Sequence, residues 1–129
     1  MKQQPFKRKT DESLIIVNCL LDRHDAALAL DTGASHTTID LAALIIAGYE
    51  VKKTVRSVPI ETASGVIEAY IFKVKRLEAI GIVRENIEIC AYDFFSYQLI
   101  TDFDGVLGLD FFENYKLCVD FKKDVLTVQ

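Results

Sequence analysis

The 129-residue sequence has no tryptophan, two prolines, six glycines and three cysteines. Each cysteine (Cys19, Cys90 and Cys118) lies in an apolar run, without the paired spacing of a disulfide framework. A zinc site would need four close ligands, and neither histidine lies near a cysteine pair. We therefore expect reduced, buried thiols, a cytoplasmic location, and no metal or other cofactor.

The sequence also lacks any apolar run long enough to cross a bilayer, and no apolar segment follows the polar N-terminus. Lys and Arg are scattered apart from residues 7–9, and the net charge is −4. A nucleic-acid-binding domain would need a clustered basic face. These features predict a protein with no membrane segment, no signal peptide, and neither nucleic acid nor membrane among its partners.

Half of the residues are apolar, and the length suits one domain. We expect a flexible tail over residues 1–12 and a single domain over residues 13–129, because the first segment is polar, basic and contains Pro5. Apolar and β-branched runs between turn signals predict a mostly β fold. Strands are expected over residues 13–21, 26–30, 51–60, 66–74, 86–92, 116–121 and 125–128, the first of them buried on both faces.

Two short helices are also expected. Asp40 suits the N-cap of a helix over residues 41–46 that is closed by Gly48. Apolar spacings of three and four over residues 109–115 predict the second helix.

The most informative stretch is an apolar run, residues 26–30, that stops at Asp31 and continues with Thr32 and Gly33. A buried strand here would bring a carboxylate to the edge of an apolar interior, where it is costly unless it is hydrogen-bonded or used. Thr32 can stabilise the following loop through its hydroxyl, and Gly33 permits a close approach. Taken alone, these residues favour an ordinary strand-to-turn junction.

Two later stretches have features of the same kind. A hairpin turn at Ser64–Gly65 joins two extended segments, and an apolar pair followed by Gly108 would let a strand pass close to another chain segment. Asp102, Asp104 and Asp110 flank the second stretch. We interpret these three carboxylates as turn and cap residues rather than as a cation site.

In this order, Asp31-Thr32-Gly33-Ala34-Ser35, Thr62-Ala63-Ser64-Gly65-Val66 and Val106-Leu107-Gly108 resemble the retropepsin-like aspartic proteases. The resemblance extends over roughly residues 14–128. It implies a small closed barrel with one or two short helices, an aspartic endopeptidase activity and an extended polypeptide substrate. It also allows the N-terminal segment to be a strand added to a dimer interface.

The resemblance assigns the roles of the family's functional residues to the matching positions of this sequence. The resemblance implies that Asp31 is the catalytic residue, one from each subunit. The supporting loop would be Thr32, Gly33, Ala34 and Ser35; the substrate-binding flap Thr62, Ala63, Ser64 and Gly65; the segment behind the site Gly105, Val106, Leu107 and Gly108.

The chain has a single Asp-Thr-Gly and no Asp-Ser-Gly. Hydrolysis by an activated water needs a base and an acid, which two carboxylates provide by sharing a proton, as in aspartic proteases. The hypothesis is therefore a homodimer with paired Asp31 residues. A non-catalytic dimeric peptide-binding module and an unrelated small β domain stay open as alternatives. Residues 93–104 form a longer and more aromatic region than a minimal retropepsin needs, so this region could reshape or cover the cleft.

Overall fold

The computed structural model describes residues 1–8, 10, 13–62, 65–97 and 101–129. Strands dominate these ranges, and the helices are short. The elements are β1 (Lys2–Pro5), β2 (Ile16–Leu21), β3 (His24–Leu30), β4 (Thr38–Asp40), α1 (Leu41–Ile46), the 3-10 helix η1 (Val51–Lys53), β5 (Arg56–Thr62), β6 (Gly65–Ala79), β7 (Ile82–Tyr92), β8 (Gly105–Leu107), the 3-10 helix η2 (Leu109–Phe112), β9 (Leu117–Asp120) and β10 (Val125–Val128).

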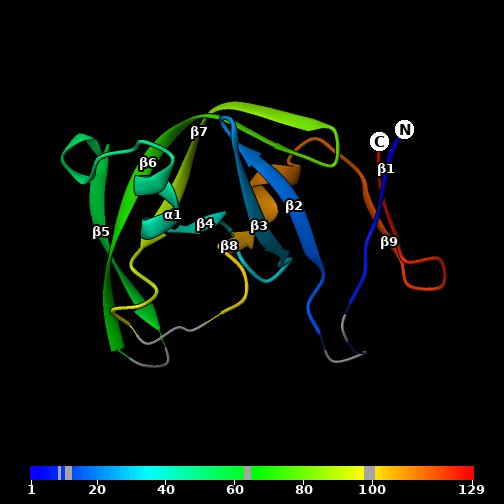
Figure 1. The fold of residues 1–129 in the computed structure, drawn as a ribbon, viewed down its shortest axis with the longest axis horizontal. Helices are drawn as coiled ribbons and strands as arrows, with labels where there is room; N and C mark the ends of the chain where they lie inside the picture. The colour runs from blue at the N-terminus through cyan, green and yellow to red at the C-terminus, as the bar shows by residue number, and fades with distance from the viewer. Residues whose placement is uncertain (9, 11–12, 63–64, 98–100) are drawn as a thin grey trace.

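Six strands close into a barrel in the order β2-β3-β8-β4-β7-β6, because β6 also pairs with β2 (Figure 1). The β3–β8 and β4–β7 pairs are parallel, whereas the other pairs in the ring are antiparallel. Among the described residues, strand β5 pairs only with β6, so this hairpin extends the sheet beyond the closed ring. The expected mostly β closed barrel with short helices is confirmed.

A second sheet contains the chain ends, with the order β1-β10-β9 (Figure 1). Its first strand lies where we expected a flexible tail. Phe6 explains the difference, since its ring is buried and packs edge-on against Phe121 at 6.3 Å between centroids. The N–H of Phe6 also donates to the carbonyl oxygen of Asp124. The first residues therefore pair with β10, while the boundary of the domain at residue 13 stays a prediction.

The barrel interior is filled by aliphatic side chains from every strand of the ring. Strand β2 shows the pattern, since Val17, Cys19 and Leu21 are buried while Asn18 and Leu20 face solvent. The expectation that this strand is buried on both faces is therefore wrong: a strand of a small barrel has its outer face in water. Fully buried side chains on the other strands include Leu28, Ile39, Leu77, Ile89 and Leu107.

Helix α1 begins as predicted, with the Asp40 carboxylate accepting a hydrogen bond from the N–H of Ala42. The strand predicted from residue 51 is wrong in its first part. Residues 51–53 form η1 instead, because i→i+3 backbone bonds replace strand pairing there and Val51 is exposed. Helix η2 is also shorter than predicted, ending before Asn114, whose φ is +67°.

The predicted final hairpin, formed by β9 and β10, is confirmed. The prediction that all three cysteines are buried is wrong for Cys118. Cys118 is exposed, because it points away from the face of β9 that carries the half-buried Leu117 and Val119. Cys19 and Cys90 are buried as expected, and all three thiols are free. Among the described residues, no helix is long and apolar enough to span a membrane.

Candidate active site

Strand β3 brings Asp31 to the end of the barrel. Leu28 and Ala29 are buried, so the strand is fixed against the core, and the chain leaves it at Asp31. The backbone N–H of Asp31 donates to the carbonyl oxygen of Leu107 at 3.1 Å, which continues the parallel β3–β8 ladder by one residue. The carboxylate is partly exposed, and its Oδ1 accepts a hydrogen bond from the N–H of Gly33 at 2.9 Å.

The loop after Asp31 turns back on itself. The N–H of Ala34 donates to the carbonyl oxygen of Asp31 at 3.2 Å, and the Ala34 carbonyl accepts from the N–H of Leu109 at 2.9 Å. The Ser35 hydroxyl and Nδ1 of His36 lie 2.9 Å apart, and Thr32 is exposed. Five consecutive residues therefore form a compact loop with Asp31 at its start.

The segment from Gly105 to Gly108 lies directly behind this loop, and both glycines are required by close packing. A Cβ at Gly108 would lie 2.8 Å from the carbonyl oxygens of Ala34 and His36. A Cβ at Gly105 would lie 2.1 Å from the carbonyl oxygen of Thr38. Between the two glycines, Leu107 is fully buried and Val106 half-buried.

A buried hydrogen-bond network joins the loop to η2, and sequence reasoning missed it. Thr37 is 0% exposed, and both its backbone N–H and its hydroxyl donate to Oδ1 of Asp110, at 2.9 and 2.7 Å. The Thr37 hydroxyl also accepts from the N–H of Gly108 at 3.1 Å. In the sequence, this network is visible only as a Thr and an Asp that each lie near an apolar run. The two positions are 73 residues apart, so no local pattern predicts that they bond.

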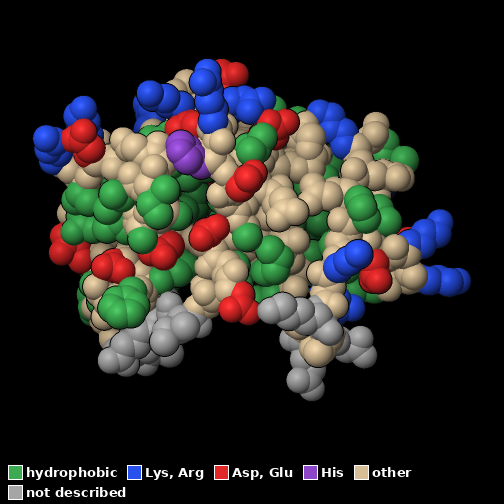
Figure 2. Space-filling view, viewed as in Figure 1, with side chains coloured by type: hydrophobic (Ala, Val, Ile, Leu, Met, Phe, Trp, Pro, Cys, Tyr) green, Lys and Arg blue, Asp and Glu red, His purple; other side chains and the backbone are tan. Residues whose placement is uncertain are grey.

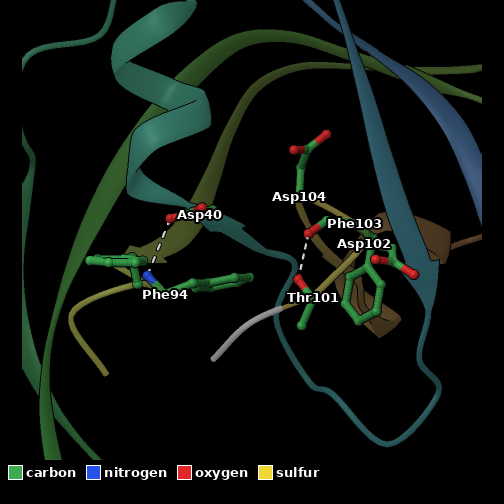
Figure 3. A pocket seen from close by; sticks show the side chains of 7 residues that line it. Asp40, Phe94, Thr101, Asp102, Phe103 and Asp104 are labelled. Atoms are coloured by element: carbon green, nitrogen blue, oxygen red, sulfur yellow. Dashed lines mark hydrogen bonds between the residues drawn. The ribbon is translucent and has the colours of Figure 1, made fainter. Parts of the chain in front are cut away.

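The carboxylates near residues 102–104 have structural partners. Oδ2 of Asp104 accepts from the N–H of Ala27, and Oδ1 of Asp40 accepts from the N–H of Phe94 and caps α1. A pocket of about 310 Å³ is lined by Asp40, Phe94, Phe95, Thr101, Asp102, Phe103 and Asp104 (Figure 3). Within the described ranges, no group of three His, Cys, Asp or Glu side chains could hold a metal ion.

The predicted flap residues, Thr62 to Gly65, lie at the end of the β5–β6 hairpin. Thr62 is the last residue of β5 and is in register with Gly65, the first of β6, whose φ is +123°. Ala63 and Ser64 lie outside the described residues. Figure 2 shows the face of the molecule that is turned to the viewer in Figure 1, with carboxylates through its middle and Lys and Arg side chains along its upper rim and one end. The structure thus joins the Asp31 loop to Gly105–Gly108 by hydrogen bonds, and it joins the hairpin to them through the shared sheet.

Comparison with known proteins agrees with this geometry. A family model described as aspartyl protease matches residues 17–111, which contain all three predicted stretches. The fold is similar to that of a retropepsin-like aspartic protease from Rickettsia conorii, with a TM-score of 0.73, 20% identity, and 100% of this chain and 99% of that chain covered. It is also similar to the retroviral protease-like domain of Ddi1 from Leishmania major, with a TM-score of 0.59, 16% identity, and coverage of 90% and 88%.

No curated protein sequence matches this one significantly. The two structural similarities are at low identity and concern the fold, so they confirm the expected retropepsin-like architecture. The family model spans well over half of the sequence. On that match, the chain belongs to the aspartyl protease family.

Proposed function

We propose that this chain is an aspartic endopeptidase that acts as a homodimer, with Asp31 of each copy as the catalytic residue. The observation that carries the proposal is the placement of the Asp31 carboxyl. It stands partly exposed at the end of a buried strand, and its Oδ1 accepts a hydrogen bond from the N–H of Gly33. The backbone of Asp31 is fixed by its own N–H, which donates to the carbonyl oxygen of Leu107. The sequence provides only one such loop, so a second copy must supply the second carboxyl.

The chemistry follows from two carboxyl groups in contact. Both cannot ionise, so the pair shares one proton and titrates as a unit. The ionised Asp31 takes a proton from a water molecule, whose oxygen attacks the peptide carbonyl carbon, while the protonated partner donates to the carbonyl oxygen. The carboxyl that took the proton from water then passes it to the departing nitrogen as the C–N bond breaks. The other carboxylate takes a proton from a hydroxyl of the tetrahedral intermediate, which becomes the product carboxylic acid, and the pair again shares one proton.

The remaining predicted residues would support and close this site. Thr32, Gly33, Ala34 and Ser35 hold the catalytic loop, with the exposed Thr32 hydroxyl available for a bond across the dimer axis. Gly105, Val106, Leu107 and Gly108 form its back wall. Thr62, Ala63, Ser64 and Gly65 form the flap tip over an extended polypeptide, which binds as an added strand. The free thiols support a cytoplasmic location.

The test compares Asp31→Asn with the parent and with Asp25→Asn, which alters an exposed aspartate on β3, the strand that leads to Asp31. A peptide library is incubated with each protein from acidic to neutral pH, and the oligomeric state is measured by analytical ultracentrifugation. We expect Asp31→Asn to lose cleavage while it keeps the parent's dimer and melting temperature. Asp25→Asn should cleave like the parent.

Cleavage by Asp31→Asn at the parent's rate, or an active monomer, would refute the proposal. A peptide that the parent binds across this pH range without cutting would instead identify a non-catalytic dimeric peptide-binding module.

A further inference from the structure

The turn that follows β7, residues 93–97, is attached firmly to the body of the domain. Phe94 is 6% exposed, and its N–H donates to the Asp40 carboxylate that caps α1 (Figure 3). The Asp93 carboxylate accepts from both the N–H and the hydroxyl of Ser96, and these bonds lower the pKa of Asp93. The turn therefore holds Tyr97 in a defined position, where its ring packs edge-on against Tyr92 at 6.0 Å.

The hydroxyl of Tyr97 reaches the β5–β6 hairpin. It accepts a hydrogen bond from the backbone N–H of Glu68, on β6, at 3.2 Å. Glu68 is in register with Pro59 of β5, but its N–H does not point towards that strand. The carbonyl of Ile71 points towards β5, since it accepts a hydrogen bond from the N–H of Val55, the residue just before β5. Backbone groups of successive strand residues point to alternate sides, so the even-numbered residues of β6, including Glu68, direct their N–H groups away from β5.

On that other side the partner strand has stopped. The pair Tyr70 and Ala91 is the last that β6 makes with β7 before the hairpin, and β7 ends at Tyr92. The N–H of Glu68 is therefore the first donor of β6 beyond the ladder. The Tyr97 hydroxyl takes the place of the missing strand at the base of the hairpin. Ser57, Val58, Val66 and Ile67 complete the lining of the adjoining pocket.

We propose that Tyr97 is a positioning residue that holds the β5–β6 hairpin in place through its hydroxyl. This inference rests on the proposed function, in which that hairpin is the flap over the substrate. Beyond its base, the hairpin lies outside the barrel ring, and within the part of the chain that the structure describes β5 pairs only with β6. A bond at Glu68 therefore restrains a large part of the hairpin's motion. The aromatic turn thus links the α1 cap to the flap.

The test uses Tyr97→Phe, which keeps the ring against Tyr92 and removes only the hydroxyl. The matched control is Tyr115→Phe, because Tyr115 is 41% exposed and Tyr97 is 38% exposed. Loss of one hydrogen bond should speed amide exchange at Glu68 about fivefold, with the rest of the barrel and the melting temperature unchanged. Because fewer molecules hold the hairpin in its binding position, KM should rise by up to about fivefold with kcat unchanged.

Equal exchange at Glu68 in Tyr97→Phe and the parent, or an equal change in Tyr115→Phe, would overturn the proposal. Faster exchange with an unchanged KM in an active parent would also overturn it, because the bond would then not position the hairpin for substrate. A parent that cleaves no peptide would contradict the proposed function alone, since the exchange experiment still decides whether Tyr97 holds the hairpin.

Discussion

Replacing Thr37 with valine removes a single hydroxyl from the network behind the Asp31 loop. Valine has nearly the shape of threonine, so the change leaves little empty space in a site where the side chain is 0% exposed. The hydroxyl donates to Asp110 at 2.7 Å and accepts from Gly108 at 3.1 Å. The substitution therefore leaves the buried N–H of Gly108 without its acceptor and removes one of the donors to the Asp110 carboxylate.

Both losses lower the free energy of unfolding. A buried donor without a partner costs about 1–3 kcal/mol, and a hydrogen bond to a charged group contributes about 1.5–3 kcal/mol. Because one hydroxyl makes both bonds, we expect a combined loss of about 3 kcal/mol. For a domain of this size, that corresponds to a melting temperature lower by about 10 °C. Among the described residues, Oδ2 of Asp110 is buried without a partner, so this carboxylate depends on Thr37.

The control is Thr37→Ser, which keeps the hydroxyl and removes one buried methyl group. Its expected loss is about 1 kcal/mol. Urea unfolding at neutral pH measures the parent and both variants, and the order of stability should be parent, serine, valine. A valine variant as stable as the serine variant, or more stable, would refute the assignment of this stabilisation to the hydroxyl.

Three further substitutions or treatments test other parts of the fold. Gly105→Ala places a Cβ 2.1 Å from the carbonyl oxygen of Thr38, so urea unfolding should show a loss of about 3 kcal/mol or more. Tyr49→Phe removes a hydroxyl with two hydrogen-bond partners and should cost about 1–2 kcal/mol near neutral pH. Burial raises the pKa of Tyr49 from 10.0 to about 12, so its neutral form stabilises the fold below pH 10.0 and this contribution is lost as the pH rises towards 12. Melting curves over that interval should therefore fall less steeply with pH for Tyr49→Phe than for the parent. In the folded protein a thiol reagent should label the exposed Cys118 but not Cys19, whose pKa burial raises to about 12.

Each of these expectations has an outcome that contradicts it. A fully stable Gly105→Ala variant would mean that β4 and β8 can separate at no cost. Parallel melting curves for Tyr49→Phe and the parent at alkaline pH would show that this phenol does not titrate differently on unfolding. Labelling of the folded Cys118→Ser variant would show that a buried thiol is accessible.

The sequence predicted several local features correctly, because neighbouring residues provide their interactions. Asp40 caps α1 because the bonded N–H lies two residues away. The hairpin of residues 117–128 needs only its own turn and alternation. The apolar run before Asp31 predicted both a buried strand and its end. The first part of the predicted strand over residues 51–60 was wrong, because its apolar side chains have no core beside them and the chain turns into η1.

By itself, the sequence determined the mostly β class through its apolar runs and turn signals. Its motifs, through their resemblance to retropepsin-like proteases, implied the closed barrel, the loop at Asp31 and the glycines behind it. Only the tertiary structure decided that Thr37 bonds to Asp110, that β1 joins β10, that Cys118 faces water and that Tyr97 reaches Glu68. These contacts join segments far apart in the chain. Their partners follow from strand register and from how the barrel closes, and the physical reason is that no local propensity specifies either.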